Sequence, residues 1–363
     1  MPARASGPET AMLPFILPQR PAVTRIRQRE GTPNLNGNRT QPMAGFEDQY
    51  VDIVDYIVGI TDEIWRDRAV GRIYDTYDAG CAVYTTYGVL RSVEDVVAAT
   101  IVALDGFPDE ETEHLNVAWS GDDQVGFYTS HLGQSAATNL GTTAYGPATG
   151  RRVSSRFCAD CISRTNRIHT EWLVRDNSAL VQQLGLDLHE TARAIAAVLP
   201  LDVAVISVPT RLEGQAPRRF YDMPNDTPSG WAQHHFGQIW NARRFEHVPF
   251  HYAAHAVAHW PGGRAATGPR AIGALIIALL ASLPDATVRI ENVCWSEESD
   301  GAILAVRWLM EGTTRPGGLL GVVPGGKAVF VIGMSHMRFD DDYVVEEWTV
   351  FDEVGVLAQA YRQ

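Results

Sequence analysis

The feature that most constrains this chain is a signature that occurs twice, at positions 176 residues apart. Residues 171–176 read Glu-Trp-Leu-Val-Arg-Asp, and residues 347–352 read Glu-Trp-Thr-Val-Phe-Asp. The same offset places Trp119 over Trp295. A repeat of this length is typical of two fused domains and not of a solenoid built from short units. The sequence therefore predicts that one module has been used twice.

Length and composition agree with two domains, because 363 residues with 45% hydrophobic content are enough for two cores. We expect a first domain over residues 46–186 and a second over 229–363, with a connector over 187–228 that belongs to neither copy. Residues 1–45 are rich in Pro and Arg and lack hydrophobic periodicity. We expect this segment to be disordered or to lie as an arm over a neighbouring surface.

The charge of the chain excludes some partners. The formal net charge of −13 argues against a nucleic-acid partner, because phosphate binding needs clustered Lys and Arg. No apolar run has the length of a membrane-spanning helix, and the N-terminal segment lacks the apolar stretch of a signal peptide. We therefore expect a cytoplasmic protein with no nucleic-acid or membrane partner.

Each copy is predicted to begin with helices and to continue into strands. Amphipathic helices are expected at 51–67 and about 231–243, each followed by a short strand with a turn and by another helix. The later strands are expected at 113–120, 124–134, 152–163 and 168–174, and at 287–296, 302–312, 327–339 and 343–350. This order predicts an α+β fold of two cone-shaped domains, in which a curved antiparallel sheet wraps around helices and its concave face holds a small molecule.

Several short motifs follow one another between residues 252 and 352. In order they read Tyr-x-x-x-x-x-x-His-x-Pro-Gly-Gly, Leu-Pro-Asp, Ala-Val-Arg-Trp, Gly-x-x-Pro-x-Gly-Lys and Arg-Phe-Asp-Asp-Asp-Tyr-Val-Val-Glu-Glu-Trp-x-x-x-Asp. The series resembles the SnoaL-like polyketide cyclase (ester cyclase) branch of the nuclear transport factor two-like superfamily. The resemblance covers about 231–360 closely and 46–186 more loosely. It implies a tandem duplication packed as an internal pseudo-dimer, with further homo-oligomerisation left open.

The resemblance also implies a class of chemistry. Cyclases of this family are understood to use a carboxylate to remove a proton alpha to a carbonyl, without metal or cofactor. We therefore expect a cofactor-independent general acid–base enzyme, a lyase or isomerase of the cyclase, isomerase or dehydratase type, acting on a small carbonyl compound. Two alternatives stay open, because one fold hosts many functions: a non-catalytic ligand-binding or scaffold protein, and water activation like that of limonene epoxide hydrolases.

The resemblance places the base at the Asp that closes the last strand. This is Asp352 in the second copy and Asp176 in the first, although an Asp before an apolar helix is also a good helix cap. Sixteen residues upstream of each lie His336 and Asp160. Polar groups inside apolar strands either face a pocket or pair with each other. Since the second copy keeps more of the family pattern, we predict Asp352 with His336 as the active pair.

Other side chains are predicted to bind substrate. In the repeat, His131 takes the place of Arg307, and either can hold an anionic or carbonyl oxygen. The remaining predicted substrate-binding residues are His259, Trp260, Tyr252, Trp348, Tyr84 and Trp172.

Two spacings resemble sets of metal ligands. Cys158 and Cys161 are three residues apart in a predicted strand, where they point to opposite faces. His251, His255 and His259 are spaced by four, but their segment passes from helix into strand, so the three cannot share one face. We expect no metal, nucleotide or flavin.

Overall fold

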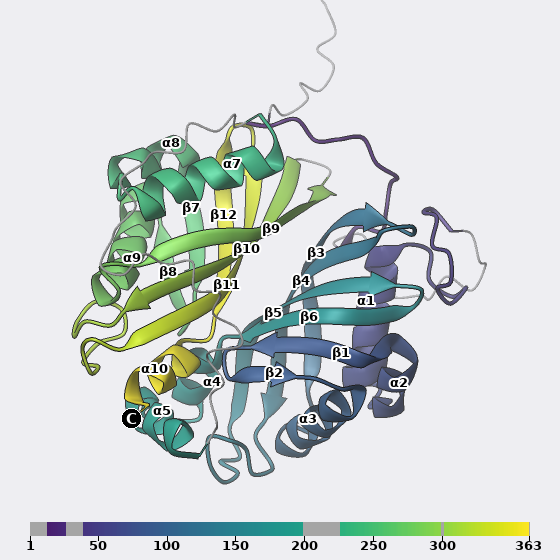
Figure 1. The fold of residues 1–363 in the computed structure, drawn as a ribbon, viewed down its shortest axis with the longest axis horizontal. Helices are drawn as coiled ribbons and strands as arrows, with labels where there is room; N and C mark the ends of the chain where they lie inside the picture. Colours follow the sequence, from purple (N-terminus) through teal and green to yellow (C-terminus); the bar gives the residue numbers. More distant parts are fainter. Residues whose placement is uncertain (1–12, 27–38, 199–225, 299–300, 363) are drawn as a thin grey trace, which may run out of the picture.

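The computed structural model describes residues 13–26, 39–198, 226–298 and 301–362. In this part of the chain, the strands form one sheet in the order β2-β1-β6-β5-β4-β3-β9-β10-β11-β12-β7-β8 (Figure 1). The order of the first six strands reappears in reverse in the last six, with each strand replaced by its counterpart in the second half. The predicted α+β fold with two curved, largely antiparallel sheet regions is confirmed.

The elements of the two halves correspond one to one. The first half contains α1 (Ile53–Thr61), η2 (Asp62–Arg66), η3 (Val70–Arg72), α2 (Ile73–Thr76), β1 (Tyr77–Thr85), β2 (Gly88–Leu90), α3 (Val93–Gly106), β3 (Glu111–Asp122), β4 (Gly126–Thr138), β5 (Arg152–Arg164), β6 (Arg167–Arg175) and α4 (Asn177–Gln183). The second half contains α7 (Pro228–His235), η4 (Phe236–Asn241), η5 (Phe245–His247), α8 (Val248–His251), β7 (Tyr252–Trp260), β8 (Arg264–Thr267), α9 (Pro269–Ser282), β9 (Thr287–Glu298), β10 (Gly301–Thr313), β11 (Ala328–Asp340), β12 (Tyr343–Phe351) and α10 (Glu353–Tyr361).

Local sequence explains where several helices begin. The side chain of Asp52 accepts a hydrogen bond from the Asp55 backbone N–H at the start of α1, and Ser92 does the same for Asp95 at the start of α3. Short polar side chains at this position satisfy backbone N–H groups that have no partner within the helix. The helices of each half cover the concave face of its strands (Figure 1).

The convex faces of the two sheet regions pack against each other. Buried side chains from both halves form one apolar cluster there, including Leu132, Cys158 and Val174 from the first half and Leu309 and Phe330 from the second. Because alternate residues of a strand point to opposite faces, each strand contributes one set of side chains to this interface and the other set to its own domain core.

The register corrects one predicted equivalence. Across a bulge in each domain, Leu132 pairs with Asn116 and Arg307 pairs with Asn292. Arg307 therefore corresponds to Leu132 and not to His131, which corresponds to Val306. A shift of one residue moves a side chain to the other face of the sheet, so His131 and Arg307 point to different places.

The described part of the N-terminal segment lies over both domains. Phe15 packs edge-on against Phe339 of the second domain, with ring centroids 5.1 Å apart. The Arg20 guanidinium lies over the rings of Trp119 and Trp295, 4.3 Å and 4.6 Å from their centroids, and donates to both backbone carbonyls. Trp119 and Trp295 pair β3 with β9. The segment thus contacts the place where the two sheet regions join.

The connector contributes one helix, α5 (Leu188–Val198), whose Ala192 and Ile195 join the core of the second domain. A strand proposed from sequence at 202–208 lies outside the described residues. None of the described helices has the length and apolarity to cross a membrane.

Candidate active site

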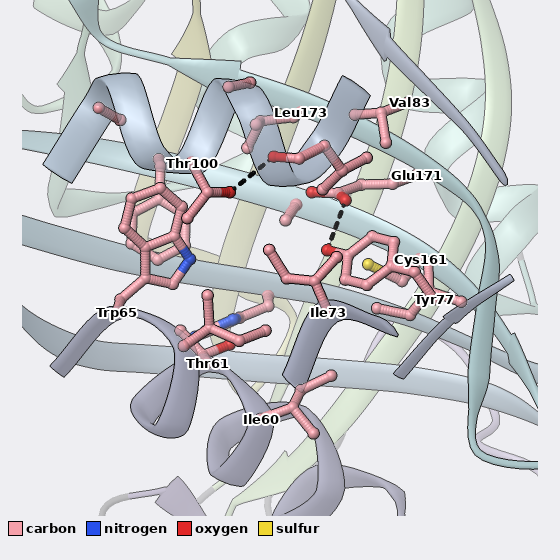
Figure 2. Close-up of a pocket in the computed structure, with 18 of the residues that line it drawn as sticks. Ile60, Thr61, Trp65, Ile73, Tyr77, Val83, Thr100, Cys161, Glu171 and Leu173 are labelled. Carbon is pink, nitrogen blue, oxygen red and sulfur yellow. Dashed lines mark hydrogen bonds between the residues drawn. The ribbon is translucent and has the colours of Figure 1, made fainter. Parts of the chain in front are cut away.

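The first domain contains a cavity of about 340 Å³ between its helices and the concave face of its strands (Figure 2). This volume is at the lower end for sites that bind small molecules. Most of the wall is apolar, supplied by Ile, Val, Leu, Ala and aromatic side chains. The polar groups in the wall include His131, Glu171, Tyr77 and Arg175.

A chain of hydrogen bonds links His131 to the surface. The Nε2 atom of His131 lies 2.9 Å from Nδ1 of His114, whose Nε2 lies 2.9 Å from Oδ1 of Asp62. Asp62 in turn forms an ion pair with Arg66, a partly exposed residue one turn along the same helical segment. His131 is only 2% exposed, so this chain connects a buried cavity-wall imidazole with solvent-accessible charges.

Glu171 and Tyr77 form a second polar pair in the wall. The Tyr77 hydroxyl donates to the Glu171 carboxylate over 2.9 Å, and Figure 2 shows this bond on the side of the cavity opposite Trp65. Burial raises the pKa of Glu171, while the Tyr77 hydrogen bond and the Arg175 charge oppose that rise. The carboxyl group therefore holds its proton to a higher pH than an exposed glutamate.

Arg175 ends β6 at the wall of the cavity. Its guanidinium carbon lies 5.3 Å from the centroid of the Trp65 ring and 5.9 Å from that of Phe157. The Trp65 indole N–H faces the cavity (Figure 2) and has no hydrogen-bond acceptor among the described residues. Both side chains thus present donors to whatever occupies the cavity.

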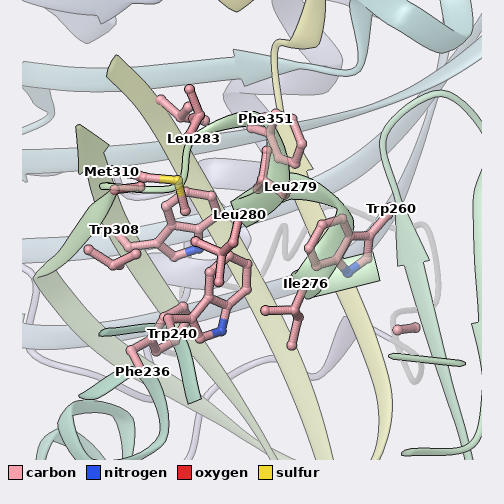
Figure 3. Close-up of a cluster of buried hydrophobic side chains, with 14 of the residues drawn as sticks. Phe236, Trp240, Trp260, Ile276, Leu279, Leu280, Leu283, Trp308, Met310 and Phe351 are labelled. Atoms are coloured by element: carbon pink, nitrogen blue, oxygen red, sulfur yellow. The ribbon is translucent and has the colours of Figure 1, made fainter. Parts of the chain in front are cut away.

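In the second domain, large apolar side chains fill the corresponding space (Figure 3). The equivalent strands and helices replace Thr61 with Phe236, Thr85 with Trp260, Thr100 with Ile276, Ala103 with Leu279 and Arg175 with Phe351. The rings of Trp240 and Trp260 stack 5.8 Å apart, and Trp260 meets Phe351 edge-on at 6.1 Å.

The histidine chain of the first domain has no counterpart in the second. Val306 and Ile290 replace His131 and His114, because they hold the same places in the strand register. The glutamate–tyrosine pair, by contrast, is present in both domains. In the second, Glu347 accepts hydrogen bonds from Tyr252 and Trp260 inside the filled core. A pair that both domains keep is explained by the fold alone, whereas the histidine chain is specific to the domain with the cavity.

The predicted bases Asp352 and Asp176 lie at helix N-termini where the two domains meet. Asp352 accepts from the Gly355 backbone N–H at 3.0 Å and from the Asn177 side chain at 2.6 Å. Asp176 accepts from the backbone N–H groups of Ala179 and Gly262. Burial raises the pKa of Asp352 to about 6. Neither residue lines the first-domain cavity.

His336 and Asp160 lie at the interface where the sheet regions of the two domains pack against each other. The ring nitrogens of His336 contact Asn116 at 2.9 Å and Ser130 at 3.0 Å, and burial lowers the pKa of this histidine to about 3, so it is neutral. Asp160 accepts hydrogen bonds from Ser130 and Tyr128. Burial raises the pKa of Asp160 to about 6, against the opposing charge of Arg307.

Arg307 joins the two domains. Its Nε lies 3.4 Å from an Asp160 oxygen, its Nη1 lies 2.7 Å from Glu291, and its guanidinium carbon lies 3.5 Å from the centroid of the Trp172 ring. Asp160, His336 and Arg307 therefore belong to an interface between sheets. The predicted pairing of His336 with Asp352 is not seen, because each has other partners.

The predicted aromatic residues divide between this interface and the filled core. Trp172 stacks on Tyr84 and Trp348 stacks on His259, on the convex faces of β6 and β12. Tyr252 and Trp260 are buried in the second-domain core. Of the predicted site residues, His131 alone lines the first-domain cavity.

Sequence reasoning missed Glu171, Arg175, His114 and Asp62. Glu171 and Arg175 stood inside the repeated signature, but the residues selected there were Trp172 and Asp176. A usable signal was present, because the repeat replaces Arg175 with Phe and His114 with Ile in the other copy.

The structure places the cysteines and histidines of the two metal-like spacings in separate surroundings. Cys161 lines the cavity, whereas Cys158 lies between the sheets. His251 is buried beside His235, and His259 pairs with Glu346. Among the described residues, no group of three or more His, Cys, Asp or Glu side chains is arranged to hold a metal ion.

Comparisons with known proteins give a family for the second domain. Residues 232–360 match the model of the SnoaL-like polyketide cyclase family. No curated protein matches this chain.

Several solved structures are similar over the length of one domain. A SnoaL-like polyketide cyclase from Agrobacterium tumefaciens is 17% identical, with 36% of this chain and 97% of that chain covered and a TM-score of 0.31. IdmH from Streptomyces antibioticus is 19% identical, with 37% of this chain and 98% of that chain covered and a TM-score of 0.32. TsrD from Streptomyces laurentii is 16% identical, with 37% of this chain and 97% of that chain covered and a TM-score of 0.33. Through the match at residues 232–360, the second domain is similar to the SnoaL-like polyketide cyclase family.

Proposed function

We propose that this protein is a cofactor-independent general acid–base enzyme that acts on a small carbonyl compound in the first-domain cavity. The observation that carries the proposal is the hydrogen-bonded chain Asp62–His114–His131, which ends at the cavity wall. The filled second domain has apolar residues in place of both histidines. The proposal moves the chemistry from Asp352, the base expected from sequence, to His131.

The arrangement suits His131 to accept a proton. Because Asp62 accepts from Nε2–H of His114, Nδ1 of His114 is left to accept from Nε2–H of His131. We assign the imidazole of His131, which lines the cavity, as the base that takes a proton from a carbon alpha to the substrate carbonyl. The carboxylate of Asp62, acting through His114, stabilises the imidazolium that forms.

The electron pair of the broken C–H bond moves onto the carbonyl oxygen and gives an enolate. The Trp65 indole N–H faces the cavity and is the donor we assign to that oxygen. In a β,γ-unsaturated substrate the electron pair extends to the γ-carbon, and transfer of the proton from the His131 imidazolium to that carbon gives an isomerisation. Attack of the enolate carbon on a second carbonyl of the same molecule closes a ring, and the His131 imidazolium returns its proton to the alkoxide that forms.

The test is exchange of the alpha protons of 2-tetralone, a C–H acid with an apolar body, followed by NMR in D₂O. We expect the protein to accelerate exchange, and His131→Gln to reduce that acceleration at least about a hundredfold. His255→Gln changes an exposed histidine of the other domain and serves as the matched control. Exchange no faster than in buffer, or full activity in His131→Gln, contradicts the proposal.

Asp352 remains the alternative base. Its partners Gly355 and Asn177 support a capping role, so we expect Asp352→Asn to keep exchange within about twofold. Loss in Asp352→Asn with activity retained in His131→Gln would return the chemistry to Asp352. Exchange no faster than in buffer for the wild-type protein favours the non-catalytic binder, and loss in neither variant means that a different group is the base.

The epoxide-hydrolase alternative needs two carboxylates that share one water. The two carboxyl groups of the cavity wall have separate partners, Ser135 for Glu110 and Tyr77 for Glu171. This geometry does not favour shared water activation.

A further inference from the structure

We propose that the substrate carries a carboxylate that binds Arg175, so that the substrate class is an anionic carbonyl compound with an apolar body. This inference rests on the proposed function for the same cavity. It adds a specificity-determining residue in the cavity wall.

The Arg175 guanidinium has no hydrogen-bonded or ion-paired carboxylate among the described residues, and it acts on Glu171 of the same wall through its charge, which lowers the pKa of that carboxyl group. No hydrogen-bond acceptor or carboxylate contacts its guanidinium among the described residues, and its contacts are the rings of Trp65 and Phe157. By contrast, Arg264 binds both oxygens of Glu353, and Arg307 binds Glu291. A guanidinium that lies over an aromatic ring can still donate hydrogen bonds, because its N–H groups point outward in the plane of the guanidinium itself.

The carboxyl groups nearest to Arg175 in the wall are already engaged. Glu171 accepts from Tyr77, and Glu110 accepts from Ser135. An incoming carboxylate therefore meets a guanidinium whose donors are not taken. The planar fork of guanidinium N–H groups matches the two oxygens of a carboxylate, and such a charge-assisted pair is stronger inside an apolar cavity than in water.

The other domain shows that the fold does not need this charge. At the same place in β12, the residue is Phe351, which is fully buried and packs against Trp260 and Trp308. An apolar side chain is therefore compatible with the strand and the core. The positive charge at Arg175 is left to act on what enters the cavity.

The chemistry of the rest of the wall defines the body of the ligand. Ile64, Ile73, Val83, Leu90 and Leu173 line the cavity, so a flat or compact hydrocarbon framework fits between them. The ligand that matches all of these features has one carboxylate on an apolar framework, together with the carbonyl on which His131 acts.

The experiment is calorimetric titration with 2-naphthoate and with 2-naphthamide, which have the same framework and differ in charge. We expect the acid to bind at least about tenfold more tightly than the amide, and the difference to shrink as salt is raised. Arg175→Met should abolish the preference, and Arg175→Lys should keep part of it. Arg152→Met is the matched control, because Arg152 is a partly exposed arginine of β5 that pairs with Asp109 outside the cavity.

Equal binding of the two compounds, binding of neither, or an unchanged preference in Arg175→Met overturns the inference. The His131→Gln variant separates this inference from the proposed function. It should retain the preference for the acid while losing deuterium exchange. An Arg175-dependent preference in a protein whose exchange does not depend on His131 leaves the carboxylate site standing and removes the acid–base proposal.

Discussion

The two domains share one arrangement of strands and differ in what fills the concave face. In the first domain, Gly133 of β4 lies beneath the ring of Phe157 on β5. In the second domain the positions are exchanged, with Trp308 on β10 lying over Gly333 of β11. In each pair, one large ring needs a glycine as its neighbour. The comparison teaches that a single fold tolerates either an open or a filled interior when large and small residues change together.

The difference extends to polar groups. The first domain has Arg175 and His131 in its cavity wall, with His114 hydrogen-bonded to His131. The second domain has apolar residues at all three positions. Burying a charged or polar side chain without a partner is costly, so a filled core selects against such residues. Among the described residues, the histidine chain and Arg175 are therefore features of the first domain that the second does not share.

The largest expected effect comes from making the first domain resemble the second. Thr85→Trp places the residue of Trp260 at the equivalent end of β1, where it enters the cavity. We expect deuterium exchange and naphthoate binding to fall at least about a hundredfold, while the protein stays folded. Thermal unfolding and calorimetry of the purified variant measure both. Normal binding in a folded Thr85→Trp protein would show that the ligand site lies elsewhere.

The next largest effect is on stability, and it tests whether the large ring and its neighbouring glycine compensate for each other. Trp308→Gly leaves an unfilled space in the second core and should lower the free energy of unfolding by about 3–5 kcal/mol. Adding Gly333→Phe, which copies the first-domain pairing, should restore part of this loss. Urea unfolding of both variants gives the comparison. Additive losses in the double variant would contradict the proposed compensation, and exchange activity should persist in both.

A third prediction concerns pH at the contact between domains. The folded pKa of Asp352 is raised to about 6 by burial, above its ordinary value of 3.8. Its stabilising contribution is therefore fully present below about pH 4 and is lost as pH rises through 6. The expected change is about 3 kcal/mol, since one pKa unit corresponds to about 1.36 kcal/mol.

Asp352→Asn should remove this dependence, so the unfolding free energy of the variant should fall less steeply between pH 4 and 7 than that of the wild type. Asp160 has the same raised pKa and stays in both proteins, so some dependence should remain. Unfolding in urea at four pH values measures the two slopes. Parallel curves would mean that Asp352 is not the titrating group.

The smallest effect is expected at the N-terminal segment. Arg20→Met removes a guanidinium that lies over Trp119 and Trp295 and donates to their carbonyls. We expect a loss of about 1–2 kcal/mol in unfolding free energy and no change in deuterium exchange, because the segment lies away from the cavity. Reduced exchange in this variant would show that the junction between the domains influences the cavity.

Much of the architecture was predictable from sequence. The repeated signature set the number of modules, and the periodicity of the strands set the α+β class, because both depend on local pattern. The N-cap role of Asp352 was also visible as an alternative, since a short acidic residue before an apolar helix caps it.

The site was less predictable, because it depends on which face of each strand meets the helices. Trp172 and Glu171 are neighbours in sequence, yet Trp172 lies between the sheets and Glu171 lines the cavity. The strands β4 and β10 begin at Gly126 and Gly301, one residue short of the 176-residue repeat, so a constant sequence offset matched His131 with Arg307 across opposite faces.

By itself, the sequence determined that two copies of one module are present, where their strands lie, and which family the second copy resembles. Only the tertiary structure decided which copy contains a cavity and which polar residues surround it. The physical reason is that secondary structure follows from the spacing of apolar residues along the chain. A cavity instead depends on how the volumes of side chains from many distant elements, such as Trp240, Trp260 and Trp308, add up in one space.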